Sequence, residues 1–345
     1  MKSAVFASIR EGAGKTSILA GIMSALNDQY GYVKPIGDRL IYKRKRNRDY
    51  DSTLIIDLFG LKDDAESITL GFDHSKLRYM YDEESLEKAL NEMVEQAGKD
   101  RKGVFIEAGR DIFYGSSVKL DPVSLARYTQ SPLVLVVSGE DESVMDLLSF
   151  IKKNIDLQGV SDVSVIINKV YDIDDFESIY LRDIEKMGFK VLGILPYKEQ
   201  LTQYTVSYVA DRLYAKVIAG ENGLDQVVKA VFVGAMSTGE SLRNPMFNKQ
   251  SKFLITSGDR NDMILSALES DTVGILLTNN ILPPSNIISL ANEKNIPMLL
   301  VAMDTYNAAR HIGRMETLLT SDNKDMLRLL KQLASKYIKT DKIFG

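Results

Sequence analysis

Residues 8–17 read SIREGAGKTS, and they follow a short apolar run, SAVFA at residues 3–7. The stretch fits the pattern G-x-x-x-x-G-K-[ST] except at its first position, where Ile9 replaces glycine. A strand, a glycine-rich turn and a helix in this order bring backbone N–H groups and a positive helix end around phosphate oxygens. The residues of the predicted phosphate-binding loop are Gly12, Ala13, Gly14, Lys15, Thr16 and Ser17.

Apolar, β-branched runs alternate with stretches of helical spacing over the following 200 residues. Such alternation is typical of strands joined by crossover helices in a parallel sheet. We therefore predict an α/β fold, a P-loop NTPase-type, mostly parallel sheet with helices on both faces. The expected strands are 3–7, 31–35, 103–107, 133–138, 163–167 and 191–195, and the expected helices include 16–27 and 142–154.

A glycine- and asparagine-rich stretch, AGENGL at residues 219–224, interrupts this pattern, and the alternation then restarts. We expect two domains, residues 1–219 and 220–345, the second a smaller α/β domain. Its expected strands are 253–256, 273–277 and 298–301, and its expected helices are 261–268, 285–293, 305–312 and 324–337.

The bulk composition narrows the class of protein. The 345 residues include no cysteine, which excludes disulfides and thiolate catalysis, and no apolar run reaches the ~20 residues of a membrane helix. A secretory signal is not expected, so the cytoplasm is the default location. The net charge of -4 offers no general field for nucleic acid. The basic run at residues 43–48 is expected to be a solvated loop or a contact with an anionic ligand or the partner domain.

Several charged residues near the loop suit nucleotide chemistry. Lys15 would reach the β- and γ-phosphates, and the Thr16 hydroxyl would bind Mg²⁺. Glu107 ends an apolar strand, where it either contacts the metal or simply meets solvent. Asp51 either reaches the metal or caps the following helix. Arg10 either contacts phosphate, as an extra lysine does in one subgroup of P-loop proteins, or is a solvated cation.

Asn168 ends another apolar strand, and its amide could pair with the edge of a purine. The sequence continues Lys169, Val170, Tyr171, Asp172, so the aspartate of the guanine-specific N-K-x-D element is displaced. We therefore expect adenine in preference to guanine.

Taken together, these motifs resemble the dethiobiotin synthetase-like branch of P-loop proteins. The resemblance rests on the loop and on five further segments, YVKPIG at 32–37, DYDSTLI at 49–55, VFIEAG at 104–109, VIINKV at 165–170 and VLGILPY at 191–197. The second domain resembles a DRTGG domain through GDRNDMILSAL at 258–268, GILLTNN at 274–280 and VAMDTYNAARHI at 301–312. The combination is similar to the N-terminal regulatory region of long-form phosphotransacetylases.

The resemblance implies roles for individual residues. Lys15 and Lys34 would be the catalytic cations, with Lys34 facing the substrate or the γ-phosphate. Thr16, Asp51 and Glu107 would hold Mg²⁺, and Asn168 would lie near the adenine. The implied cofactors are therefore ATP and Mg²⁺.

Two departures bear on function. Dethiobiotin synthetases carry E-G-A-G-G where this chain has EAGRD at residues 107–111, which argues against diamine chemistry. The DRTGG signature has Asn279 and Asn280 in place of its glycine pair. The resemblance also implies that an acyl-transfer domain would begin beyond Gly345, so we expect no acetyl-phosphate chemistry from this polypeptide alone.

A polar group in the second domain comprises Asp259, Arg260, Asp304 and Thr305 at strand-to-helix transitions. Such positions collect ligands in open α/β sheets, but the two aspartates also suit helix N-caps. His74 and His311 lack metal-ligand spacing.

Three functions remain open from the sequence. The first is an ATP-dependent regulator or sensor that acts on an oligomer or on a metabolic enzyme partner. The second is an ATP-dependent ligase of dethiobiotin synthetase or amidoligase type, acting on a small carboxylate or carbamate. The third is an interaction protein with a relic nucleotide site. We expect a nucleotide ligand and a homo-oligomer, and neither nucleic acid nor a membrane as partner.

Overall fold

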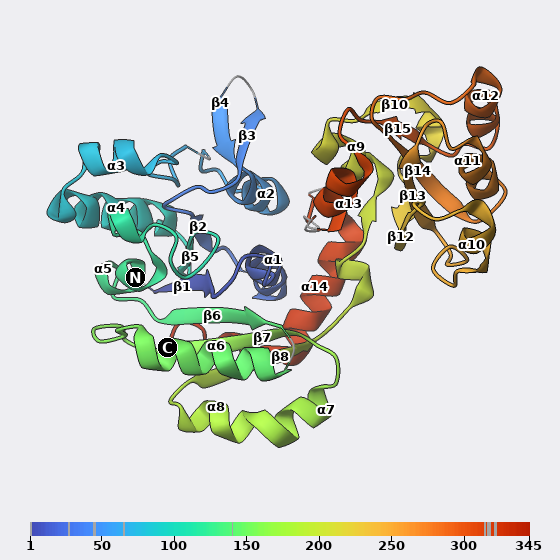
Figure 1. Ribbon diagram of the computed structural model, residues 1–345. Helices are drawn as coiled ribbons and strands as arrows, with labels where there is room; N and C mark the ends of the chain where they lie inside the picture. The colour runs from blue at the N-terminus through green and yellow to red at the C-terminus, as the bar shows by residue number, and fades with distance from the viewer. Residues whose placement is uncertain are drawn as a thin grey trace. The chain divides into compact units, whose positions relative to one another are not determined.

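The computed structural model describes residues 2–26, 28–43, 46–64, 66–139, 141–313, 315, 319–320 and 323–345. The chain forms two compact units, each with its own main sheet (Figure 1). The first unit comprises Met1–Lys198 and Leu319–Gly345, and the second comprises Glu199–Leu318. Among the described residues, no helix is both long enough and apolar enough to cross a bilayer.

The first unit contains a six-stranded parallel sheet in the order β2-β5-β1-β6-β7-β8. Its strands are β1 (Ser3–Ser8), β2 (Gly31–Val33), β5 (Val104–Glu107), β6 (Leu133–Ser138), β7 (Val163–Val170) and β8 (Lys190–Pro196). β1 and β5 are buried along their whole length because helices cover both faces of the sheet, which explains their nearly continuous apolar sequences. β1 lies between β5 and β6, so the segments that follow these three strands meet at one edge of the sheet.

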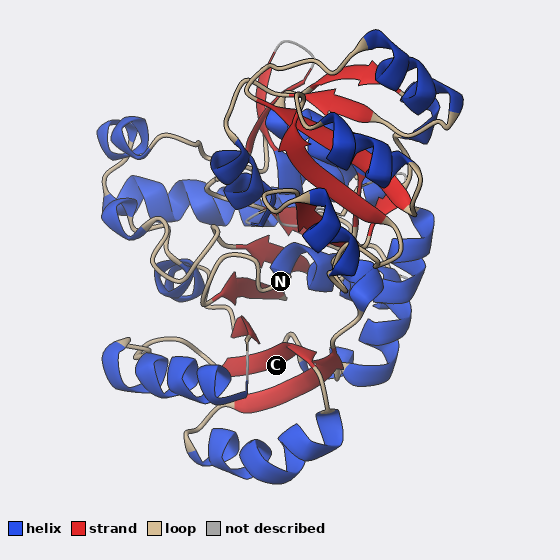
Figure 2. Ribbon diagram, turned by 45° about the vertical axis from the view of Figure 1, so that its right-hand side comes forward, coloured by secondary structure: helices blue, strands red, loops and turns tan. Residues whose placement is uncertain are grey.

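Helices surround this sheet on both sides, as the views in Figures 1 and 2 show. They are α1 (Lys15–Leu26), α2 (Tyr50–Phe59), α3 (His74–Met80), α4 (Glu83–Gly98), α5 (Pro122–Tyr128), α6 (Asp141–Asn154), α7 (Ile173–Phe176), α8 (Arg182–Lys186) and α14 (Lys324–Tyr337). The predicted fold class is confirmed for this unit.

The basic run at residues 43–48 lies partly in a β-hairpin that the sequence did not predict. β3 (Leu40–Lys43) pairs antiparallel with β4 (Arg46–Asp49), and Leu40 lies opposite Asp49. The two middle residues of the run, Arg44 and Lys45, lie outside the described residues. The hairpin leads directly into α2, whose first turn contributes to the candidate site.

The second unit has a five-stranded sheet in the order β10-β15-β14-β13-β12, parallel except for the β10–β15 pair. Its elements are β9 (Tyr204–Thr205), α9 (Val206–Leu213), β10 (Lys216–Ala219), β11 (Val227–Val228), β12 (Ala230–Val233), α10 (Thr238–Arg243), β13 (Lys252–Ser257), α11 (Asn261–Leu268), β14 (Thr272–Thr278), α12 (Ser285–Glu293), β15 (Met298–Leu300) and α13 (Thr305–Gly313). One hydrophobic cluster joins the sheet to α11 and α12, and another joins it to α9 and α13. This is the smaller α/β region expected from the sequence.

The division between the units differs from the boundary predicted at residue 219. The stretch AGENGL is packed inside the second unit, because a Cβ at Gly220 would lie 2.3 Å from the carbonyl of Ile296. The last helix, α14, belongs to the first unit. It packs along α1, and Ile338 just after it bridges to Gly193 of β8. The ring of Phe344 then stacks on Tyr30 at 5.5 Å.

We predict that Gly21→Ala destabilises the first unit. A Cβ at Gly21 in α1 would lie 2.7 Å from the carbonyl oxygen of Leu330 in α14, so one helix must shift. Overpacking of this kind costs about 1–3 kcal/mol and opposes the ~1 kcal/mol that alanine gains in helix propensity. We expect a lower midpoint in urea unfolding followed by circular dichroism.

Gly239→Ala is the matched control, because no described atom beyond its chain neighbours and its own helix backbone lies within 4 Å of a Cβ at Gly239 in α10. This variant should be as stable as the wild type or slightly more stable. Equal behaviour of the two variants would show that α1 and α14 are not in close contact.

Candidate functional site

The segment between β1 and α1 has the backbone geometry of a phosphate-binding loop. Gly12 and Gly14 adopt left-handed conformations with φ of 77° and 92°. No described backbone carbonyl accepts a hydrogen bond from the N–H groups of residues 12–17. These donors at the start of α1 can therefore bind oxyanions. Ile9, in place of the usual first glycine, is 5% exposed and anchors the loop in the core.

Two consecutive side chains of β7 hold the loop from outside. The Asn168 Nδ2 donates to the carbonyl of Ala13 at 2.9 Å, and the Lys169 Nζ donates to the carbonyl of Gly12 at 2.7 Å. The register between β7 and β8 shifts between Ile167 and Val170, and Lys169 has a φ of 67°. This irregularity turns both side chains toward the loop. The predicted proximity of Asn168 to an adenine stays a prediction.

Lys15 lies at the start of α1 and is 7% exposed. Its Nζ donates to the carbonyls of Ala108 at 2.6 Å and Gly109 at 2.5 Å, and it lies 3.9 Å from a carboxylate oxygen of Glu107. Burial lowers the pKa of Lys15 below its ordinary value. The ammonium is thus held at the end of β5, beside the loop.

Glu107 is buried and makes two hydrogen bonds. Its Oε1 accepts from the Thr16 hydroxyl at 2.7 Å, and its Oε2 accepts from the Tyr32 hydroxyl at 2.7 Å. Burial and the negative charge of Asp51 raise the pKa of Glu107. Tyr32 was not singled out in the sequence, although its place in YVKPIG, two residues before Lys34, was the available signal.

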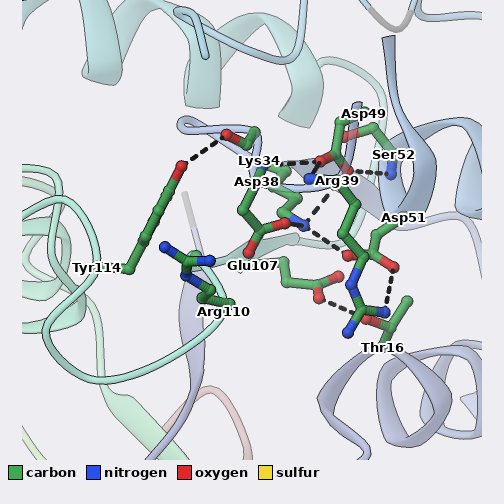
Figure 3. Close-up of polar contacts among 12 residues, drawn as sticks. Thr16, Lys34, Asp38, Arg39, Asp49, Asp51, Ser52, Glu107, Arg110 and Tyr114 are labelled. Atoms are coloured by element: carbon green, nitrogen blue, oxygen red, sulfur yellow. Dashed lines mark hydrogen bonds and ion pairs between the residues drawn. The ribbon is translucent and has the colours of Figure 1, made fainter. Parts of the chain in front are cut away.

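Lys34 is fully buried among three carboxylates (Figure 3). Its Nζ lies 2.6 Å from Asp38, 3.3 Å from Asp49 and 2.6 Å from Asp51. Burial favours the neutral amine, but the carboxylates of Asp51 and Asp49 outweigh it and raise the pKa of Lys34 well above its ordinary value. One oxygen from each aspartate lies within 4.8 Å of the others, a spacing that suits a cation. The ammonium of Lys34 is the cation at that point.

Asp49 caps α2, which settles one of the alternatives left by the sequence. The Ser52 N–H donates to one oxygen of Asp49 at 3.0 Å, and the backbone N–H groups of Asp38 and Arg39 donate to the other. The alternative that Asp51 is the N-cap is therefore wrong. Asp51 lies in the first turn and contacts Lys34, with Arg39 at 3.9 Å. Burial opposes its ionisation, yet Lys34 and Arg39 lower the pKa of Asp51.

The oxygen ligands required for Mg²⁺ are present together. The Thr16 hydroxyl and the Glu107 carboxylate are already in contact, and Figure 3 shows Asp51 beside them. Hydroxyl and carboxylate oxygens next to a phosphate loop are the donors that Mg²⁺ prefers. The residues therefore fit the predicted ion, although Asp51 is also committed to Lys34. Arg10 is exposed and Ser17 is half-buried.

The polar residues of the second unit mostly have structural partners. Arg260 donates to the backbone carbonyls of Gly234 and Met236 rather than pairing with Asp259. Asp304 accepts from the N–H of Asn307 at 2.8 Å and so caps α13. The Thr305 hydroxyl contacts that of Thr278 at 2.8 Å.

We predict that Lys34→Met strongly destabilises the first unit, and more so as pH rises. In the wild type the lowered pKa of Asp51 stabilises the fold above the unfolded-state pKa, and this contribution disappears as pH falls through the folded-state pKa. Without Lys34 the three buried carboxylates bind protons more tightly in the folded state, so stability declines with increasing pH. Removal of one partner from a buried ion pair costs about 3–5 kcal/mol.

Urea unfolding at about pH 5 and about pH 8 measures this difference. Lys190→Met serves as the control, because Lys190 is 69% exposed although it lies 2.8 Å from Asp162. Its loss should cost less than about 1 kcal/mol. A loss for Lys34→Met that is equally small at both pH values contradicts the prediction.

Comparison with known proteins identifies related sequences. A family model described as an AAA domain matches residues 2–205, and another described as a DRTGG domain matches residues 208–315. A phosphate acetyltransferase from Nitratidesulfovibrio vulgaris is 24% identical over 353 residues, which covers 96% of this chain and 49% of that protein. A phosphate acetyltransferase from Pseudomonas aeruginosa is 24% identical over 361 residues, which covers 95% of this chain and 49% of that protein.

The chain therefore spans about half the length of these curated relatives. A solved structure of the CBS and DRTGG domains of the regulatory region of Clostridium perfringens pyrophosphatase, complexed with its activator diadenosine tetraphosphate, is 18% identical. The match covers 51% of this chain and 87% of the pyrophosphatase chain. Its TM-score of 0.28 is too low to establish a shared fold. The matches confirm the predicted pairing of a dethiobiotin synthetase-like P-loop domain with a DRTGG domain and the resemblance to phosphotransacetylases.

Proposed function

Because the chain belongs to the AAA domain family over residues 2–205 and carries a DRTGG domain at residues 208–315, we propose that it is a nucleotide-dependent regulator. The first unit binds ATP with Mg²⁺, and the bound nucleotide controls an acyl-transfer enzyme related to the phosphate acetyltransferases. That enzyme is either a separate polypeptide or a further part of the same one. The proposed location is the cytoplasm, and the proposed assembly is a homo-oligomer.

The phosphate loop is the observation that carries this proposal. The N–H groups of residues 12–17 have no described backbone acceptor, and they surround the N-terminus of a 12-residue helix. Such a ring of donors favours the phosphates of a nucleotide. The contact between Thr16 and Glu107 lies directly beside it, as a phosphate-bound Mg²⁺ requires.

Each residue of the site has a role in this proposal. Thr16, Glu107 and Asp51 hold Mg²⁺, which neutralises charge on the phosphates. Lys15 leaves the carbonyls of Ala108 and Gly109 to contact the β- and γ-phosphates. Asn168 keeps the loop in shape through Ala13, and its amide oxygen faces the base.

The surroundings of Lys34 favour a regulator over an enzyme that transfers the phosphoryl group of ATP. A catalytic lysine must approach the phosphoryl group as charge develops there. Lys34 is instead fully buried and bound by three carboxylates, so any approach to the phosphate costs these contacts. The segment after Glu107 also lacks the glycine-rich sequence that helps to bind the diamine in dethiobiotin synthetases.

The alternative is an ATP-dependent ligase that activates a small carboxylate or carbamate. The full set of Lys15, Lys34 and Glu107 in one place supports it. The two functions differ in turnover, because a regulator binds ATP without a co-substrate and hydrolyses it slowly, whereas a ligase hydrolyses it only when an acceptor is present.

We predict that Lys15→Ala weakens the binding of Mg-ATP by about 100-fold, because a charge-assisted contact to phosphate is lost. Isothermal titration calorimetry measures the change. Lys186→Ala is the control, since Lys186 is exposed and its ammonium forms an ion pair with Asp183 on the surface of α8. Full affinity in Lys15→Ala would mean that the loop does not bind phosphate.

ATP hydrolysis by the wild type, measured with and without bicarbonate, diamines and small carboxylates, distinguishes the two functions. We expect tight binding with negligible turnover under every condition. Turnover that depends on an added acceptor would instead establish the ligase.

A further prediction concerns Asn168, whose amide supports the loop. If its main role is to hold Ala13, Asn168→Ala should weaken binding of both ATP and inorganic tripolyphosphate by roughly 10-fold. If its main role is to contact the base, only ATP binding should weaken. Competition between tripolyphosphate and a fluorescent ATP analogue measures both affinities.

A further inference from the structure

Arg110 occupies the segment where this chain departs most from its resemblance to dethiobiotin synthetases. It follows β5 by three residues, and its backbone carbonyl accepts from the Ser8 hydroxyl at 2.9 Å. Ser8 is the last residue of β1, immediately before the phosphate loop. Arg110 is therefore fixed at the edge of the loop. Figure 3 shows its guanidinium on the side of Tyr114 that faces Asp38 and Glu107.

Tyr114 supports the guanidinium. The Arg110 Cζ lies 4.8 Å from the centre of the Tyr114 ring, within the range of a cation–π contact. The Tyr114 hydroxyl donates to the carbonyl of Gly37 at 3.2 Å, and His74 packs against the ring at 5.0 Å. Gly109 is needed for this arrangement, because a Cβ there would lie 2.2 Å from the Tyr114 ring. The guanidinium thus rests on a ring that is held on several sides.

The donors of Arg110 are not used inside the protein. The side chain is 48% exposed, and its nearest carboxylate, on Asp111, lies 4.0 Å away. In the described parts of the chain, no hydrogen bond engages the guanidinium. A planar guanidinium with five free N–H donors is suited to an oxyanion with two oxygens in one plane.

The arrangement of charged side chains around the loop favours binding of an oxyanion near Arg110. Asp38, Asp49 and Asp51 already surround Lys34, and Glu107 neighbours Lys15. These two lysines are therefore partly neutralised before any ligand binds. Arg110 is a cation at the same edge, and the carboxylate paired with it in the described residues, that of Asp111, is 4.0 Å away at the limit of an ion pair, so Arg110 can compensate the charge of an incoming anion.

We propose that Arg110 is an anion-binding residue which, resting on Tyr114, takes an oxyanion opposite the phosphate loop. The inference rests on the proposed nucleotide site. The oxyanion is either the terminal phosphate of the nucleotide or a separate small anion bound beside it. In both cases the ligand at this position is negatively charged, unlike a diamine.

The test compares the wild type with Arg110→Gln by calorimetry, using a non-hydrolysable Mg-ATP analogue, Mg-ADP, and inorganic phosphate added to the Mg-ADP complex. If Arg110 binds the terminal phosphate, the ATP analogue loses about 10- to 100-fold in affinity while ADP is unchanged. If it binds a separate anion, phosphate binding to the ADP complex falls by a similar factor and the ATP analogue is unaffected. Either result supports the proposal.

Changes within about twofold for all three probes, in a protein whose Lys15→Ala variant loses nucleotide binding, would overturn it. If the wild type binds no nucleotide, the proposed function fails, and phosphate titrated into the nucleotide-free protein tests Arg110 alone. A weaker phosphate affinity in Arg110→Gln then supports the inference, and equal or undetectable binding overturns it.

Three further variants and one control separate the position of the guanidinium from its charge. Arg110→Lys keeps the charge but not the planar donors, so its affinity should be intermediate. Tyr114→Phe keeps the ring and should bind nearly as the wild type, whereas Tyr114→Leu should resemble Arg110→Gln. Arg243→Gln removes an exposed charge from α10 and should change nothing.

Discussion

The candidate site depends on the ion pairs between the ammonium of Lys34 and three aspartates, Asp38, Asp49 and Asp51. This ammonium joins the loop after β2 to the N-cap of α2 and to the first turn of that helix. Without this single positive charge, three carboxylates could not remain buried within a few ångströms of one another. The same charge lowers the pKa of Asp51 and so keeps its carboxylate ionised near Glu107. Lys34 therefore determines both the local fold and the charge distribution of the site.

The phosphate loop likewise depends on a few side chains from another strand. Its inner surface presents backbone donors, and its outer surface is held by Asn168 and Lys169 from β7. These two strand residues can reach the loop because the register shifts where they lie. An irregularity at the end of one strand thus determines the shape of a loop that follows another, two strands away in the sheet.

The sequence was most informative where one local pattern decides the structure. The alternation of strands and helices, the loop at residues 12–17 and the placement of Glu107 at a strand end all follow from short stretches. It was less informative where distant segments meet. Nothing local in DYDSTLI indicates that Asp49 rather than Asp51 caps α2, because the choice depends on Lys34 and on the hairpin of β3 and β4. The boundary predicted near residue 219 differs from the division into compact units for the same reason, since α14 resembles any amphipathic helix until its packing on α1 is known.

The return of the chain to the first unit has a consequence for biosynthesis. β1 and the phosphate loop are synthesised before the second unit, whereas α14, which packs on α1, is made only after the whole second unit. The nascent first unit therefore exposes the side of α1 that α14 covers while some 120 residues of the insert are translated and fold. A chain that ends within the insert lacks α14, so it cannot cover α1 as the full first unit does.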